Sequence, residues 1–104
     1  MTATDGLWGG RLTTLGFDTV THACTLGVIT TLDGSEVHHV IRCSEVSELR
    51  FENAILEPWQ YAEVTEAHLT TDEASRTQTL ELVLWSEDAG LVIRAASIEI
   101  QQAS

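Results

Sequence analysis

The sequence contains no lysine and very little positive charge of any kind. Basic residues number 5 and acidic residues 16, which gives a formal net charge of -11 at pH 7. Every basic residue is an arginine, and these arginines are scattered along the chain: Arg11, Arg42, Arg50, Arg76 and Arg94. Nucleic acids and anionic membranes are bound by clusters of Lys and Arg. The charge pattern therefore disfavours both as partners, and favours a basic protein, a cation or solubility alone.

Cysteine, proline and glycine are also scarce, with 2, 1 and 7 residues among 104. These numbers exclude a disulfide-stapled scaffold and a collagen-like or low-complexity chain. No stretch approaches the roughly 18 apolar residues of a membrane-spanning helix, and no charged and apolar leader opens the chain. We therefore expect a cytoplasmic protein in which residues 1–104 form one domain, with a core over about residues 10–100.

The residues that are present alternate with a period close to two, which indicates β-strands rich in Thr, Val, Ile and Leu. The predicted strands cover residues 10–17, 23–32, 35–44, 47–53, 61–71, 77–85 and 91–100. This spacing predicts an all-β, single-domain antiparallel meander of about seven strands, as a curved sheet, a sandwich or a partly open barrel. A short helix near 57–68 is the alternative for one ambiguous stretch, because Pro58 suits a first helical turn.

The alternation is cleanest in the predicted strand over residues 47–53. Leu49 and Phe51 are predicted to face the core, whereas Glu48, Arg50 and Glu52 are predicted to face solvent.

A hairpin turn is predicted at Asp33-Gly34, because a two-residue type I′ turn needs positive φ at both positions. That turn places Cys24 directly opposite Cys43. Opposed cysteines are close enough for a disulfide in principle. In a chain without an export signal, however, we expect two buried and reduced thiols.

The histidines form no recognisable metal motif. His38 and His39 are adjacent in a strand, so their side chains point to opposite faces. A site made of His22, Cys24, His39 and Cys43 can be drawn on paper, but the spacings match no zinc motif. We expect a partly buried, hydrogen-bonded His39, an exposed His38, and no metal or other cofactor.

Catalytic motifs are equally absent from the sequence. There is no G-x-S-x-G nucleophile elbow, and Gly9-Gly10 is an isolated doublet rather than a phosphate-binding loop. Cys43 and His39 could act as nucleophile and base, but residues on one strand face lie too far apart for that hydrogen bond. We therefore expect that the protein is not an enzyme, and we assign no catalytic, cofactor-binding or metal-binding residues.

The most informative segment surrounds the only proline, where two large aromatics and several carboxylates lie close together. The candidate partner-binding residues are Glu57, Trp59, Tyr61, Glu63 and Glu66. Trp and Tyr are favoured anchors of protein interfaces, and polar residues form the rim. The alternative is that Trp59 closes the end of the sheet and the acids are merely solvated.

A resemblance to known proteins rests on short motifs. They are Leu49-Arg50-Phe51-Glu52, Pro58-Trp59-Gln60-Tyr61-Ala62-Glu63, Leu84-Trp85-Ser86 and Ile98-Glu99-Ile100. In these the chain resembles a class of small, mostly uncharacterised bacterial all-β proteins, some of which are related to immunity proteins of polymorphic toxin systems. The resemblance implies an all-β fold and a non-enzymatic role, and it transfers no catalytic residues.

The functional hypothesis is a non-catalytic, acidic protein-binding module of immunity type or with a regulatory role. Its partner is expected to be a protein, and a basic one would be favoured by electrostatic steering. Two alternatives remain open. One is a small-ligand-binding barrel lined by Trp8 and Trp85, and the other is a structural subunit that assembles with itself.

Overall fold

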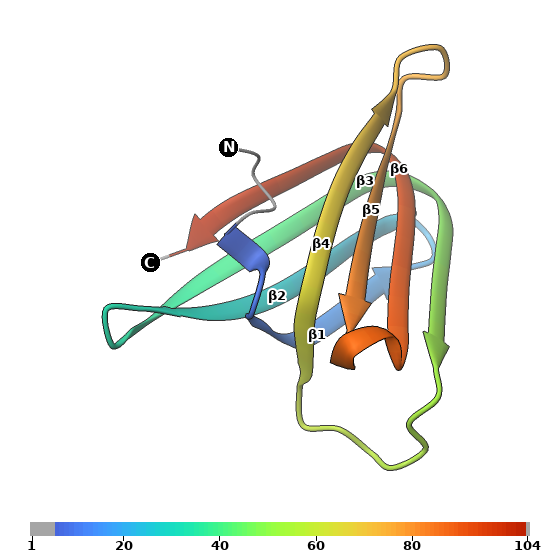
Figure 1. Cartoon of the computed structure of the whole chain (residues 1–104). Helices are drawn as coiled ribbons and strands as arrows, with labels where there is room; N and C mark the ends of the chain where they lie inside the picture. Colours follow the sequence, from blue (N-terminus) through green and yellow to red (C-terminus); the bar gives the residue numbers. More distant parts are fainter. Residues whose placement is uncertain (1–5, 104) are drawn as a thin grey trace.

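Six antiparallel strands form a closed ring in the computed structural model, which describes residues 6–103 (Figure 1). The strands are β1 (Arg11–Asp18), β2 (Ala23–Leu32), β3 (Ser35–Asn53), β4 (Ala62–Asp72), β5 (Thr77–Leu84) and β6 (Ala89–Ala103). Their order around the ring is β1-β2-β3-β6-β5-β4. A short 3-10 turn, η2 (Trp85–Glu87), joins β5 to β6. Residues 1–5 and 104 of the predicted domain lie outside the described part.

The prediction of an all-β antiparallel domain is confirmed, although the strand count is lower. The predicted strands 35–44 and 47–53 are one continuous strand, β3. The chain bends at this point instead of breaking, with Glu45 at a positive φ of 55° and a register shift against β6 between Val46 and Glu48. The bend is a β-bulge, which re-aims a strand without ending it.

The ambiguous stretch near 57–68 contains no helix. Residues 54–61 form an irregular loop, and β4 begins at Ala62. Within residues 6–103 no helix has the length and hydropathy needed to span a membrane.

The hairpin between β2 and β3 follows the predicted register. Asp33 and Gly34 adopt φ values of 52° and 79°, as a type I′ turn requires. Leu32 pairs with Ser35, and eight residues further along each strand Cys24 pairs with Cys43. Both cysteines are buried and unlinked.

The core fills the inside of the ring with aliphatic side chains from every strand. Its largest fully buried members are Leu7, Leu26, Ile41, Leu80, Leu82, Leu84, Leu91 and Ile93. Leu7 precedes the predicted core of 10–100, so the core begins earlier than the sequence indicated. At the other end, β6 continues past residue 100 and pairs with β3 as far as Ala103.

The ring closes through a very short contact between β1 and β4. Only Arg11 and Leu12 pair with Glu63 and Ala62. Val64 extends this contact, because its N–H donates to Gly10 O at 2.8 Å and its carbonyl accepts from Gly9 N at 2.7 Å. The ring is therefore uneven, with long β3–β6 pairing on one side and a narrow closure on the other.

Beyond this closure, two strand edges have no described neighbour. In residues 6–103, positions 13–18 of β1 pair only with β2, and positions 47–53 of β3 pair only with β6. The hydrogen bond from Val46 N to His22 O, 2.8 Å long, joins the β1–β2 turn to the start of the second edge. We call the opening between these two edges the seam.

The tight closure gives a test. Gly10→Ala is expected to lower the free energy of unfolding by about 1–3 kcal/mol through overpacking. An added Cβ would lie 2.8 Å from Thr30 Cγ2 and 2.9 Å from Val28 Cγ1. Gly16→Ala is the matched control, because a Cβ there meets no atom within 4 Å, and it should stay within about 0.5 kcal/mol of wild type. Urea unfolding measures both variants, and equal midpoints would contradict the tight packing of Gly10 against β2.

Candidate functional site

Four aromatic side chains from three segments pack together at one end of the ring. We call Phe51, Trp59, Tyr61 and Trp85 the aromatic cluster. Trp59 packs edge-on against Phe51 and Trp85, with ring centroids 5.7 and 6.2 Å apart, and Tyr61 lies 5.7 Å from Trp85. Such edge-to-face pairs contribute about 0.5–1.5 kcal/mol beyond the burial of their area. Neither indole N–H donates to a described residue, so packing alone positions both rings.

Trp85 reaches the cluster through an uncommon backbone conformation. Trp85 and the next residue, Ser86, both have positive φ, at 52° and 54°. Bulky residues rarely adopt this region, and where they do the surrounding structure holds them there. Here the Ser86 N–H donates to Thr65 Oγ1 at 2.8 Å. Thr65 lies in the register shift of β4 between Val64 and Glu66. The bulge in β4 therefore holds η2, the turn that follows β5.

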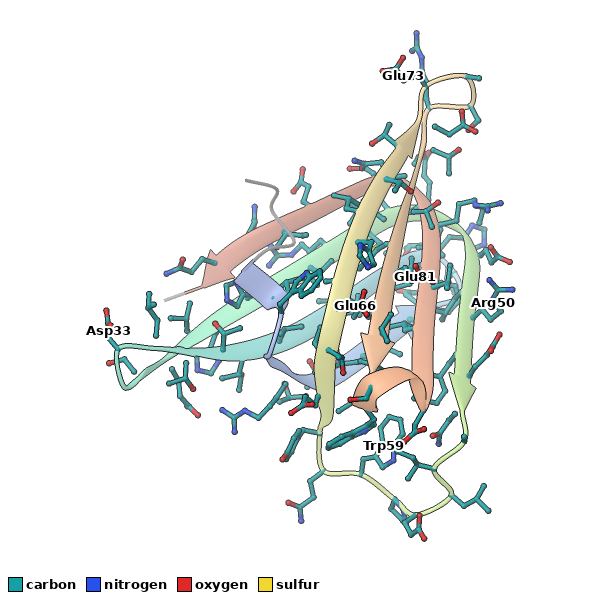
Figure 2. The ribbon with its side chains drawn as sticks, in the orientation of Figure 1. Asp33, Arg50, Trp59, Glu66, Glu73 and Glu81 are labelled. Carbon is teal, nitrogen blue, oxygen red and sulfur yellow. The ribbon has the colours of Figure 1, made fainter. Side chains whose placement is uncertain are left out.

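The loop over residues 54–61 carries Trp59 across the end of the ring (Figures 1 and 2). Its first residues are anchored, because Ala54 N donates to Asp88 O at 2.8 Å. The Asn53 side chain also bonds Ile55 twice, accepting from its N–H at 2.7 Å and donating to its carbonyl at 2.6 Å. The loop therefore enters the cluster from a fixed starting point.

Four of the five predicted partner-binding residues lie in or directly beside the loop over residues 54–61, and the fifth, Glu66, lies further along β4. Trp59 is half-buried and Tyr61 is exposed, and both belong to the aromatic cluster. Glu57 and Glu63 are exposed close to them in the chain. Glu66 instead bonds His68 at 3.1 Å along β4.

Three further residues join this site from distant parts of the sequence. They are Phe51, Trp85 and Arg11, whose guanidinium carbon lies 5.9 Å from the Tyr61 ring centroid. Arg11 also forms an ion pair with Glu36 at 2.8 Å. Composition gave no signal for these neighbours, because only the ring closure brings β1, β3 and η2 to the same place. Trp8, by contrast, packs against His68 at 5.8 Å and donates to Ala67 O at 3.0 Å, so it does not join Trp85.

A small, mainly apolar cavity connects the aromatic cluster to the seam. Its volume is about 200 Å³, and Leu12 and Leu15 of β1 line it together with Phe51, Trp59 and Tyr61. Pockets for drug-sized ligands usually measure about 300–1,000 Å³. The cavity is therefore better suited to one or two side chains than to a whole small molecule.

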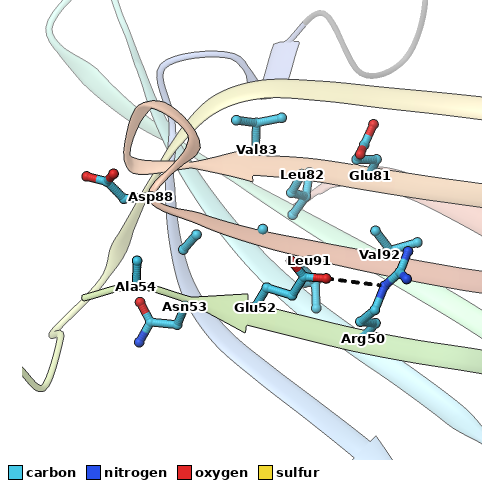
Figure 3. Close-up of a pocket in the computed structure, with 12 residues that line it drawn as sticks. Arg50, Glu52, Asn53, Ala54, Glu81, Leu82, Val83, Asp88, Leu91 and Val92 are labelled. Atoms are coloured by element: carbon cyan, nitrogen blue, oxygen red, sulfur yellow. Dashed lines mark ion pairs between the residues drawn. The ribbon is translucent and has the colours of Figure 1, made fainter. Parts of the chain in front are cut away.

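A larger groove, of about 600 Å³, lies on the outer face of β3, β5 and β6 (Figure 3). Arg50 and Glu52 form a loose ion pair across 3.8 Å there, and Glu81 and Val92 lie beside Arg50. Gly90 forms part of its floor, because it has no side chain. The groove adds exposed charges of both signs to the outer face of β3, next to the seam.

The thiols and histidines are not arranged for reaction. Burial raises the pKa of the Cys24 thiol, and burial with the neighbouring Cys24 raises the pKa of Cys43 to about 12. Burial, followed by the charge of His38, lowers the pKa of His39, whose Nε2 lies 2.9 Å from Thr30 Oγ1. His38 is exposed. Among the described residues, no group of three or more His, Cys, Asp or Glu side chains could hold a metal ion.

Comparison with known proteins extends to the fold only. No protein-family model matches the chain, and the search of curated proteins found no match. The fold is similar to that of an uncharacterized protein from Neisseria gonorrhoeae, with a TM-score of 0.68 and 15% sequence identity. The similarity covers 90% of this chain and 91% of that chain. A bacterial protein therefore shares this ring of strands.

The raised thiol pKa values predict slow cysteine chemistry. A thiol reagent such as iodoacetamide should label native protein very slowly at neutral pH, because the thiolate is the reactive form. In guanidinium chloride both Cys24 and Cys43 should label quickly, as ordinary thiols do. Mass spectrometry of the two samples measures the difference, and rapid labelling of the native protein would contradict the burial of both thiols.

Trp59 is expected to support the site structurally as well as to form part of it. Trp59→Ala should lower the free energy of unfolding by about 3 kcal/mol, because it empties the space between Phe51 and Trp85. Leu56→Ser is the matched control in the same loop, since Leu56 is 92% exposed, and should change stability by less than about 0.5 kcal/mol. Urea unfolding followed by circular dichroism compares the variants. A Trp59→Ala protein as stable as wild type would show that the cluster carries no packing energy.

Proposed function

We propose that this protein is a non-catalytic binding module that captures a segment of a basic protein partner at the aromatic cluster. The observation that carries the proposal is the half-open arrangement of the cluster. Tyr61 and Phe51 are exposed, while Trp59 and Trp85 support them from below. Rigid, partly exposed aromatics backed by a core are typical anchors at protein interfaces.

Charge supports a basic partner. The chain carries a net charge of -11, and the exposed Glu57 and Glu63 flank the aromatic cluster. A field of one sign accelerates the encounter with a partner of the opposite sign and makes association sensitive to salt. An immunity-type role, with a basic toxin as the partner, is one specific form of this proposal and rests on the resemblance of short motifs. A regulatory role is another.

Self-assembly and small-ligand binding receive less support. Two copies with the same large negative charge repel each other at low ionic strength. The cavity beside the cluster, at about 200 Å³, is smaller than the usual small-molecule pocket.

Panning of random linear peptides displayed on phage tests the proposal. Parallel selections use wild type and Tyr61→Ala, a variant that removes an exposed ring and leaves Trp59 in place. Peptides recovered on wild type should combine apolar residues with Lys and Arg. As synthetic peptides, they should bind Tyr61→Ala about tenfold or more weakly, as expected for an interface anchor, and should weaken with added salt.

Leu56→Ser serves as the control, because it changes an exposed apolar residue of the same loop outside the cluster. It should bind the recovered peptides as wild type does. Peptides that bind Tyr61→Ala and wild type equally well would place the binding surface elsewhere and refute the proposal.

A further inference from the structure

The free edge of β3 presents unpaired backbone and uncovered apolar side chains together. Residues 47–53 pair with β6 on one side and with no described residue on the other. Half of the N–H and C=O groups of such an edge point away from the sheet and can pair with another strand.

The inner face of this edge is apolar and only partly covered. Leu49 pairs with Ile93 and Phe51 with Leu91, so both lie on the core face of the sheet. Ile93 and Leu91 are buried, yet Leu49 is 36% and Phe51 50% exposed. The two side chains face the core as predicted, but no strand beyond β3 covers them. An added strand would bury them.

The outer face of the same edge carries charge. Glu48 and Glu52 flank Arg50 on this face, and their ion pairs are loose, at 4.0 Å from Glu48 to Arg94 and 3.8 Å from Arg50 to Glu52. Exposed pairs of this kind are worth little, so both carboxylates remain free to attract new cations.

The opposite border of the seam ends in one acidic residue. Asp18, at the end of β1, accepts hydrogen bonds from the N–H groups of Val20 and Thr21, and these lower its pKa. Asp18 therefore adds one negative charge at the end of this border, and Glu48 and Glu52 on the other border attract a positively charged occupant.

We infer that the free edge of β3 binds an extended, cationic segment of the partner protein as an added β-strand. On the inner face, apolar side chains of that segment pack beside Leu49 and Phe51. On the outer face, its basic side chains lie beside Glu48 and Glu52. This inference rests on the proposed function and specifies its mode. Aromatic anchors hold one end of the segment, and backbone hydrogen bonds hold the rest, as in other cases of strand addition.

The occupant is a partner segment in preference to a second copy of this chain. Each copy brings a net charge of -11, so pairing two edges costs electrostatic energy, whereas a cationic segment gains it. The alternation of charge and apolar residues on β3 also defines the complementary pattern, because directly opposed residues share a face.

A synthetic peptide tests the inference. The probe is a fluorescent, end-blocked peptide of sequence Thr-Lys-Val-Thr-Val-Lys-Thr, which alternates as the edge requires, and its binding is measured by fluorescence anisotropy. Glu52→Lys should weaken binding by about tenfold, because repulsion replaces attraction at one opposed pair. The same variant should gain affinity for the peptide with Glu in place of both Lys residues.

Glu73→Lys is the matched control, because it makes the same charge change at the tip of the β4–β5 turn, away from Arg50 and β3 (Figure 2). It should bind the probe about as wild type does. Loss of binding in Glu73→Lys equal to that in Glu52→Lys would show that only net charge matters, and would overturn the inference.

Backbone methylation separates strand addition from side-chain docking. Alternate amides of a strand point to opposite edges, so N-methylation of one alternate set should abolish binding, and methylation of the other set should leave most of it. Equal binding by both methylated peptides would refute strand addition. The proposed function would still stand if peptides recovered by panning kept their dependence on Tyr61.

Two further results would also overturn the inference. One is failure of the unmodified probe to bind wild type. The other is a dimer in sedimentation experiments that Phe51→Ser abolishes, which would make a second copy the occupant of the edge. Phe51→Ser should instead remain a monomer like wild type and lose affinity for the probe.

Discussion

β3 serves two sets of neighbours because it bends at Glu45, and the rest of the molecule depends on this bend. Before the bend, β3 lies between β2 and β6, and after it β3 keeps only β6. The bulge turns β3 away from the β1–β2 hairpin, while β3 stays paired with β6 on both sides of the bulge. The open seam, the exposed ring of Phe51 and the approach of Trp59 all follow from that change of direction.

Local signals in the sequence predicted those parts of the fold that local chemistry determines. Asp33-Gly34 fixed a turn, and the turn fixed the register that sets Cys24 opposite Cys43. The alternation of β3 likewise placed Leu49 and Phe51 on the core face correctly. The bend at Glu45 and the bulge that follows it could not be recognised, because glutamate seldom adopts positive φ and the sequence neighbours look like ordinary strand. One strand was therefore predicted as two.

Only some members of the aromatic cluster could be predicted from the sequence, for a similar reason. Trp59 and Tyr61 lie close together in sequence, so composition alone drew attention to them. Phe51, Trp85 and Arg11 join them through ring closure and through an unusual backbone conformation at Trp85 and Ser86. Those contacts depend on sheet order, and a pattern of alternation contains no information about which strand lies beside which. Exposure of Leu49 and Phe51 was missed for the same reason.

The position of β6 has a consequence for how the chain acquires its structure. This last strand enters between β3 and β5 and pairs with both. During synthesis on the ribosome, the strands made earlier can form hairpins, but the ring cannot close until β6 has emerged. Contacts between residues far apart in the sequence slow folding. Until β6 has emerged, the nascent chain exposes unpaired strand edges that can aggregate. We therefore expect chaperones to bind most strongly to nascent chains that are arrested before residue 89, because their strand edges are still unpaired.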